Sequence, residues 1–416
     1  MSRRRFTGRL AAGTLAAGLM LTACGSPGSS SSADPTTPAG SGSGSGSAAA
    51  GATGEPIKVG LVTSLSGPLQ SYGQMYLDAF NVCLADATDR TNAVGGRPIE
   101  VSTADDAGDP AKATTAATDY IGQGYTILAG SASSGVALQM APLAAENQVL
   151  FISGPAATDG ITGVNKYTFR SGRQTYQDIR TAASFIGDLQ GKTVTIFAQD
   201  TAFGQANVAA ASAVFGAEGA TVTPLLVPAT ATDLVPFAKQ AADADPNLLF
   251  VAWAGTNATQ MWEAMGQQGA FDGTTVVTGL DIKPTHTVFA PVADKLSLLA
   301  HYFDGATDNE VEKAMVAGLT AEGKTPDLFS PDGCNAALMV VRAAQESPDD
   351  VDGMITALEG WEFQGPKGTM TIRAEDHALL QPMFQTRLVD VNGTPTPELV
   401  KELAPADTAP APTPFR

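Results

Sequence analysis

Short runs of β-branched and other apolar residues alternate along the chain with longer segments whose apolar positions recur at helical spacing. The first run, 57–62, ends before Gly67-Pro68, and a helical apolar face then begins at Tyr76. Further on, Asp109 and Pro110 suit the N-cap and the first turn of another helix. The pattern predicts strands over 57–62, 99–103, 126–129 and 149–152, and helices over 76–91, 109–120 and 137–146.

The same alternation restarts after Arg170. It predicts helices over 175–189, 206–217, 234–244 and 258–266, and strands over 193–198, 220–227, 248–253 and 275–278. Strands that alternate with helices in this way are typical of a parallel sheet in an α/β fold, and two consecutive sets indicate two similar lobes. The later elements are too few for a third domain and are expected to complete the two lobes. They are strands over 295–301, 369–372 and 384–390, and helices over 310–322 and 336–346.

The N-terminus has the organisation of an export signal. Four arginines precede an uncharged stretch of about 14 residues, which closes with Leu21-Thr22-Ala23-Cys24. This stretch is shorter than the roughly 20 residues that a spanning helix needs, and small residues precede the cysteine. We expect residues 1–23 to be a lipoprotein signal peptide and Cys24 to carry the lipid. Ser2 to Phe6 resembles a twin-arginine signal, although Thr7 replaces the usual leucine, so both that route and the Sec route remain open.

Composition separates a linker from the folded part. Residues 24–55 are rich in Ser, Gly, Ala, Pro and Thr and cannot bury a core, so they are expected to form the lipid anchor and a flexible linker. The formal net charge is −18, and it becomes −22 without the four arginines of residues 1–23. Such acidity argues against nucleic acid as a partner and against a polybasic membrane surface. We therefore expect the membrane to be contacted only through the lipid.

The cysteines and histidines do not form the spacing of a metal or redox site. Besides Cys24, the chain has Cys83 and Cys334, which could either pair in an oxidising compartment or be two small buried hydrophobic residues. The three histidines, His286, His301 and His377, lie far apart in the sequence. Neither a metal nor another cofactor is expected.

The loops after the predicted strands carry small polar residues instead of reactive groups. Residues 130–135, Gly-Ser-Ala-Ser-Ser-Gly, follow one strand and open a helix, so hydroxyls and free backbone N–H groups could hold a carboxylate there. The run matches neither a Gly-x-Ser-x-Gly nucleophile motif nor a Gly-x-Gly-x-x-Gly dinucleotide motif. Residues 154–158 follow the next strand and are expected to place Thr158 beside the serines. An ordinary loop is the alternative.

An ordered set of motifs resembles the type I periplasmic solute-binding proteins of ABC importers, in particular the branched-chain amino acid (Leu/Ile/Val)-binding family. The resemblance covers about residues 57–390 and is to an actinobacterial-type lipoprotein of this family. The motifs are Ile57-Lys58-Val59-Gly60, Leu65-Ser66-Gly67-Pro68, Tyr72-Gly73, Gly95-Gly96-Arg97-Pro98, Ala104-Asp105-Asp106-x-x-Asp109-Pro110, the serine loop (residues 130–135), Pro155-Ala156-Ala157-Thr158 and Asp200-x-x-Phe203-Gly204. The resemblance implies two doubly wound parallel-sheet lobes joined by a three-crossover hinge. The expected division is 57–172 plus 302–364 for lobe 1, 173–301 plus 365–403 for lobe 2, and a Pro/Ala-rich tail over 404–416.

The resemblance also assigns residues to a ligand site. Ser133, Ser134, Ala156 and Thr158 match positions that hold a ligand carboxylate, and Tyr72 matches a tyrosine that lines the same side. Phe203 and Thr256 stand where the family often has tyrosines, while Trp253 is either an aromatic wall or a core residue. Asp281 matches the acid that takes the ligand's ammonium, with a shorter side chain than the usual Glu. Residues 368–377 resemble a segment of members that bind amides or aromatic acids.

These features predict a non-enzymatic binding protein. The expected function is capture of a small amino acid or related carboxylate or amide by hinge closure, for delivery to an ABC permease and its ATPase. Two alternatives stay open: a ligand-sensing receptor module with the same fold, and a binder of aromatic or aliphatic acids instead of amino acids. The expected location is extracytoplasmic, anchored to the cell membrane by lipid.

Overall fold

The computed structural model describes residues 54–415, which form two large sheets and one small one. The first large sheet has the strand order β2-β3-β1-β4-β5-β6, and only β2 at its edge is antiparallel to its neighbour. The order moves outward from β1 in both directions, so this sheet is doubly wound. Its strands are β1 (Ile57–Thr63), β2 (Ala93–Val94), β3 (Arg97–Asp105), β4 (Ile127–Gly130), β5 (Leu150–Ser153) and β6 (Thr168–Arg170).

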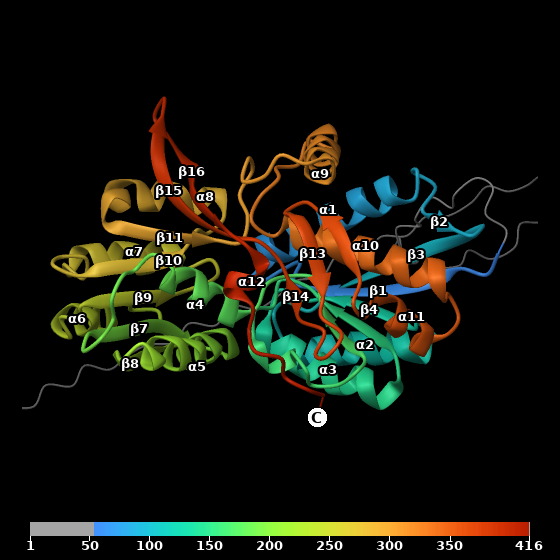
Figure 1. Cartoon of the computed structure of the whole chain (residues 1–416), viewed down its shortest axis with the longest axis horizontal. Coiled ribbons are helices and arrows are strands. Elements are labelled where there is room, and N and C mark those ends of the chain that lie inside the picture. Colours follow the sequence, from blue (N-terminus) through green and yellow to red (C-terminus); the bar gives the residue numbers. More distant parts are fainter. Residues whose placement is uncertain (1–53, 416) are drawn as a thin grey trace, which may run out of the picture. The chain divides into compact units, whose positions relative to one another are not determined.

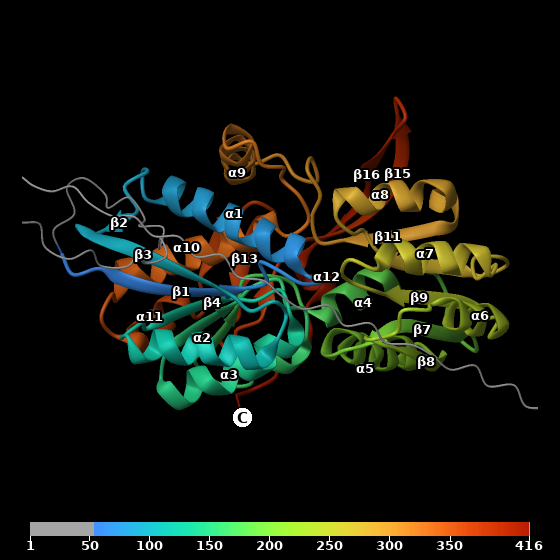
Figure 2. The same ribbon diagram turned by 180° about the vertical axis from the view of Figure 1, so that it is seen from behind.

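Helices cover both faces of the first sheet (Figures 1 and 2). One face carries α1 (Gln70–Ala87) and α10 (Ser330–Glu346), and the other carries α2 (Pro110–Gly122) and α3 (Ser134–Asn147). Helix α1 begins before the predicted start at Tyr76, because its first turn contains small and polar residues that add nothing to the apolar pattern. Asp109 caps α2 as expected, since its side chain accepts from the N–H groups of Ala111 and Lys112.

The second large sheet has the order β16-β15-β11-β10-β9-β7-β8. Its five strands from β11 to β8 are parallel, and β15 and β16 extend it as an antiparallel pair. The last strand was not predicted, because Pro395 and Pro397 interrupt its pattern. An edge strand tolerates proline, which has no N–H to donate. The strands are β7 (Thr193–Asp200), β8 (Thr221–Pro228), β9 (Leu248–Ala252), β10 (Thr275–Gly279), β11 (Leu296–Ala300), β15 (Met383–Val391) and β16 (Thr394–Leu403).

Helices also flank the second sheet on both faces. They are α4 (Thr175–Ala183) and α5 (Ala202–Ala217) on one face, and α6 (Val235–Asp243), α7 (Ala258–Gln267) and α8 (Lys283–Phe289) on the other (Figure 2). The prediction that the first of these helices continues to residue 189 is wrong. Ser184 bonds back to the carbonyl of Thr181, and Gly187 has a φ of 78° that an α-helix does not allow. With helices on both faces of two parallel-centred sheets, the expected α/β fold is confirmed.

The later segments complete these layers. Helices α9 (Glu310–Ala321) and α11 (Val351–Leu358) lie with the first sheet, and a small antiparallel sheet contains β12 (Glu362–Gly365), β13 (Gly368–Ile372) and β14 (Leu379–Leu380). The division expected at residue 365 falls within the β12–β13 pair. Short turns are η1 (Asp159–Ile161), η2 (Ala290–Lys295) and α12 (Pro405–Thr408). Within the expected tail, Thr413 donates to Asp376 and Pro410 accepts from Arg373.

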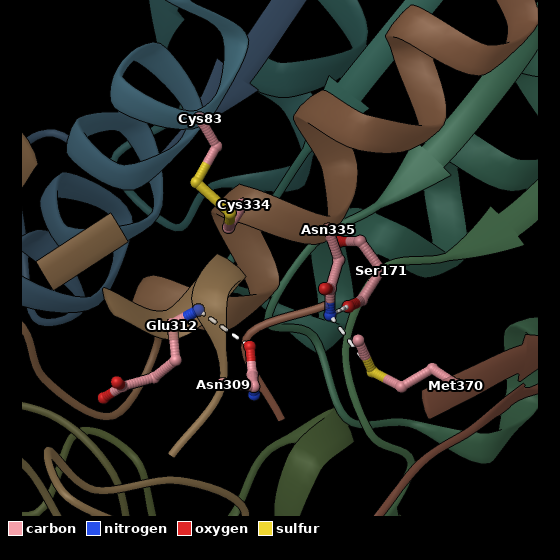
Figure 3. Close-up of a disulfide and its surroundings, with 7 residues drawn as sticks. All are labelled: Cys83, Ser171, Asn309, Glu312, Cys334, Asn335 and Met370. Carbon is pink, nitrogen blue, oxygen red and sulfur yellow. Dashed lines mark hydrogen bonds between the residues drawn. A yellow bond between two sulfur atoms is a disulfide. The ribbon is translucent and has the colours of Figure 1, made fainter. Parts of the chain in front are cut away.

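A disulfide between Cys83 and Cys334 joins α1 to α10, with a Cα–Cα distance of 5.1 Å (Figure 3). Next to it, the Asn335 side chain donates to the carbonyl of Ser171 at 2.9 Å and contacts the sulfur of Met370 (Figure 3). Helix α10 is thus fastened to α1 on one side and to the chain between β6 and α4 on the other. The two cysteines therefore form a disulfide and are not two separate buried hydrophobic residues.

The expected signal peptide, the expected lipidation site at Cys24 and nearly all of the expected linker lie outside the described residues. Within residues 54–415, no helix is both long enough and apolar enough to span a bilayer.

Candidate ligand-binding site

A cavity of about 700 Å³ lies where loops from both large sheets converge. These loops follow the carboxyl ends of parallel strands, which is where open α/β sheets bind ligands. From the first sheet the loops after β3, β4 and β5 contribute Asp109, Ser133 and Pro155, and from the second sheet the loops after β7, β9 and β10 contribute Thr201, Trp253 and Asp281. Loops of both large sheets therefore form the walls of the cavity.

On the first-sheet side, the serine loop presents the start of α3 to the cavity. Ser133 is the N-cap, with its hydroxyl accepting from the N–H of Val136, and the cavity is lined by Ser133, Ser134 and Gly135. Buried Asp106 holds this loop in place, because it accepts from the hydroxyl of Ser131. The first N–H groups of a helix have no intrahelical partners and carry partial positive charge. This end of the cavity can therefore hold an anionic oxygen.

Tyr72, in the first turn of α1, reaches loops of the second sheet. Its hydroxyl donates to Oδ1 of Asp281 at 2.8 Å and accepts from the N–H of Gly255 at 3.3 Å. Burial, followed by the charge of Asp281, raises the pKa of Tyr72 well above 10, so the phenol is neutral. Tyr72 thus acts as a donor to Asp281 from across the cavity.

Asp281 follows β10 and is well supplied with hydrogen-bond donors. Oδ1 also accepts from the N–H of Ile282 at 2.8 Å, and Oδ2 accepts from the hydroxyl of Thr285 at 3.0 Å. Burial raises the pKa of Asp281 above its ordinary value, and these donors oppose that shift. A carboxylate has about four lone-pair sites, so three donors leave room for one more.

Aromatic residues form part of the second-sheet wall. The Trp253 indole stacks on Phe197 with ring centroids 5.5 Å apart and donates to the Asn257 side chain at 2.9 Å. Phe203 lies in the first turn of α5, and both residues line the cavity together with the more exposed Thr256. Trp253 is thus half-buried and contacts both the core and the cavity.

Ala156 and Thr158 occupy different surroundings from the other expected site residues. Neither lines the main cavity, whereas their neighbours Pro155 and Ala157 do. The hydroxyl of Thr158 caps the short turn η1 by accepting from the N–H of Gly160. Thr158 also donates its N–H to Ser134, so it supports the serine loop from behind. Of the nine expected ligand residues, the structure brings seven to the cavity: Tyr72, Ser133, Ser134, Phe203, Trp253, Thr256 and Asp281.

Among the cavity residues that were not predicted from the sequence, four are buried side chains that lie near one another: Arg173, Asp178, His301 and Phe329. Each is more than nine-tenths buried. The Arg173 guanidinium lies 3.3 Å from the Asp178 carboxylate, and its carbon is 5.8 Å from the Phe329 ring centroid. Arg173 comes shortly after β6, a strand of three residues that the pattern did not predict. The signal that could have found it, a polar residue after a strand, was therefore missing.

Among residues 54–415, no group of three His, Cys, Asp or Glu side chains is arranged to hold a metal ion. The polar groups that line the cavity can bind and orient a small molecule through hydrogen bonds and charge.

Comparison with known proteins agrees with this geometry. A family described as periplasmic binding protein matches residues 56–394. A Leu/Ile/Val-binding protein of Rhizobium johnstonii is 25% identical over 346 residues, which cover 76% of this chain and 87% of that protein. The crystal structure of an ABC-type branched-chain amino acid transporter protein of Rhodopseudomonas palustris is similar with a TM-score of 0.71 and 32% identity, over 86% of this chain and all of that one.

A second solved structure shares the fold at lower identity. It is a solute-binding protein of an ABC transporter from R. palustris in complex with 4-hydroxybenzoate. Its TM-score is 0.77 at 22% identity, over 84% of this chain and 97% of that one.

Proposed function

The chain belongs to the family of periplasmic binding proteins, and on that premise we propose that it captures a small carboxylate-bearing solute for an ABC importer. Its relatives are ABC-type solute-binding proteins. The observation that carries the proposal is the cavity itself, which has the N-terminus of α3 on one side and Asp281 on the other. The protein binds and releases its ligand without chemical change.

Binding is completed when the two large sheets, each with its flanking helices, close around the ligand. The chain crosses between the two large sheets three times, between β6 and α4, between β11 and α9, and between β14 and β15. Small rotations in these connections would move the serine loop relative to Asp281 and bury the ligand from both sides. The closed form is the one that the permease and its ATPase partner receive.

The ligand's carboxylate is assigned to the first turn of α3. There it meets the N–H groups of Ser134 and Gly135 and the hydroxyl of Ser133, all at the positive end of the helix. Thr158 contributes by holding Ser134, and Ala156 by holding the loop through its bond to the Ser131 carbonyl. The apolar body of the ligand lies against Trp253, Phe203 and Tyr72.

Two ligand classes fit the opposite wall. An amino acid would place its ammonium on the remaining acceptor position of Asp281. An aromatic or aliphatic acid without an amine would leave Asp281 to its three internal donors, of which Tyr72 reaches it from the other layer. The second class has specific support, because Asp281 is already stabilised inside the protein. One neighbour in fold is described in complex with 4-hydroxybenzoate.

The site of action is outside the cytoplasm. The arginine-rich start, the short apolar stretch and Cys24 support a lipoprotein that is cut before the cysteine. The linker over 24–55 would then let the folded part reach a permease in the same membrane.

A thermal-shift screen followed by calorimetry tests the proposal. The part starting near residue 55 is heated with amino acids, small amides, and aliphatic and aromatic acids, because a ligand well above its Kd raises the melting temperature. Leucine and 4-methylpentanoate form the decisive pair, since they differ only in the ammonium. Stronger binding of leucine would assign the ammonium to Asp281, and binding confined to amine-free acids would assign the second class. No stabilisation by any carboxylate would contradict the proposed function.

A further inference from the structure

Three buried polar residues form a cluster in the cavity that no assigned role uses. Arg173, Asp178 and His301 all line the cavity, and their exposed fractions are 7%, 5% and 4%. Oδ1 of Asp178 and Nε2 of His301 have no hydrogen-bond partner among residues 54–415. Nε of Arg173 instead lies 3.3 Å from Oδ2 of Asp178 in their ion pair, and Nη1 of Arg173 donates to the carbonyl of Pro155. Buried polar atoms normally have partners, so two such atoms on neighbouring cavity residues indicate a ligand group.

Phe329 separates this cluster from the Tyr72–Asp281 pair. Its ring centroid is 4.6 Å from that of Tyr72 and 5.1 Å from that of His301, and it lies under the Arg173 guanidinium. The cluster is therefore a second polar region of the cavity, next to an aromatic surface. A ligand whose apolar body rests on Phe329 would present another group to Arg173, Asp178 and His301.

Charge decides which kind of group fits. The positive charge of Arg173 is matched by Asp178 at 3.3 Å. The other charges that act on this region are two cations, Arg170 and Lys367, and two carboxylates, Asp159 and Asp332. Burial, followed by the charges of Arg173 and Lys367, lowers the pKa of His301 well below 6.5, so its ring is neutral. A ligand anion or cation would add an unmatched charge to a buried and balanced cluster, which is costly.

A neutral hydroxyl satisfies the open positions without adding charge. It can donate to Oδ1 of Asp178 and accept from the ring of His301 when Nε2 carries the proton. We propose that Arg173, Asp178 and His301 form a hydroxyl subsite, so that the protein selects a hydroxylated carboxylic acid over the same acid without the hydroxyl. This inference rests on the proposed function, because it places the carboxylate at α3.

The test compares acids that differ by one hydroxyl group. Calorimetry measures the Kd of benzoate and 4-hydroxybenzoate, and of 3-phenylpropanoate and 3-(4-hydroxyphenyl)propanoate, on the wild-type folded part. We expect the hydroxylated acid to bind at least about tenfold more tightly in one pair, because a site built to bond a hydroxyl disfavours the ligand that lacks it. A ratio near one in every pair, or binding of neither acid in any pair, would overturn the subsite. The proposed function would fail only if the other carboxylates of the screen, leucine and 4-methylpentanoate included, also gave no stabilisation.

Two variants and one control assign the preference to the cluster. His301→Phe keeps a ring beside Phe329 but removes Nε2, and Asp178→Asn removes the carboxylate, so each should reduce the ratio by about fivefold or more. Asp178→Asn also leaves Arg173 unmatched, and should therefore raise the affinity for terephthalate relative to benzoate. His377→Phe changes a buried histidine away from the cavity, where it stacks on Phe169, and should retain the wild-type ratio. A preference that survives both cluster variants would overturn the assignment.

Discussion

The Tyr72 hydroxyl donates a 2.8 Å hydrogen bond to Asp281, a residue 209 positions further along the chain and on a loop of the other large sheet. The same hydroxyl accepts from the N–H of Gly255. One phenol therefore joins α1 to two loops of the second sheet at the wall of the cavity. A movement of α1 relative to the second large sheet would therefore change the hydrogen bonding of the buried Asp281 carboxylate.

Replacing Tyr72 with phenylalanine should weaken both binding and the contact between the layers. Asp281 would lose one of its three donors while remaining buried, which costs about 1–3 kcal/mol. We expect the affinity for the best acid of the screen to fall by about tenfold, and the ligand-free radius of gyration from X-ray scattering to increase. Tyr125→Phe is the control, because that hydroxyl pairs with Ser102 away from the cavity. Equal losses in both variants would contradict a specific role for Tyr72.

Removing the disulfide should lower the free energy of unfolding without abolishing the fold. Cys83 and Cys334 are 251 residues apart, so their bond restricts a very long loop of the unfolded chain. We expect the Cys83→Ala/Cys334→Ala variant to be about 2–5 kcal/mol less stable in urea denaturation. Wild type measured with a reductant in the unfolding buffer should approach the stability of the variant. A loss below about 0.5 kcal/mol in both experiments would show that the bond adds little.

The glycine that follows Phe203 should not tolerate a side chain. A Cβ at Gly204 would overlap the carbonyl oxygen of Gln199, because the first turn of α5 packs directly on the end of β7. Gly204→Ala is therefore expected to cost about 1–3 kcal/mol of stability and to displace the cavity wall at Phe203. Gly216 lies in the same helix with open space around it, so Gly216→Ala should be neutral or stabilise by up to about 1 kcal/mol. Thermal unfolding of the two variants compares them directly.

Acidification should destabilise the protein partly through His301. Burial lowers the pKa of this histidine in the folded state, so the unfolded chain takes up a proton first as the pH falls below 6.5. Its stabilising contribution is thus complete above pH 6.5 and is lost below it. Between pH 7.5 and 5.5 we expect wild type to lose about 1.4 kcal/mol more than His301→Phe in urea denaturation. Parallel pH profiles for the two proteins would contradict this expectation.

Much of the fold follows from local pattern. The alternation of strands and helices over 57–278 reflects periodicities of neighbouring residues, and the cap at Asp109 depends only on the next three positions. The predicted helices and strands were wrong or missing where contacts between distant segments determine the local structure. Residues 184–189 have helical spacing but turn at Gly187, and β16 contains prolines that only an edge strand accepts.

The sequence by itself determined the layered α/β architecture and the loops that reach the cavity, because strand ends and helix starts are local features. Only the tertiary structure decided which side chains meet. Arg173, Asp178, His301 and Phe329 come from separate segments with no common motif, and Cys83 pairs with Cys334 because α1 packs on α10. Such contacts depend on how distant elements pack, which no local periodicity encodes.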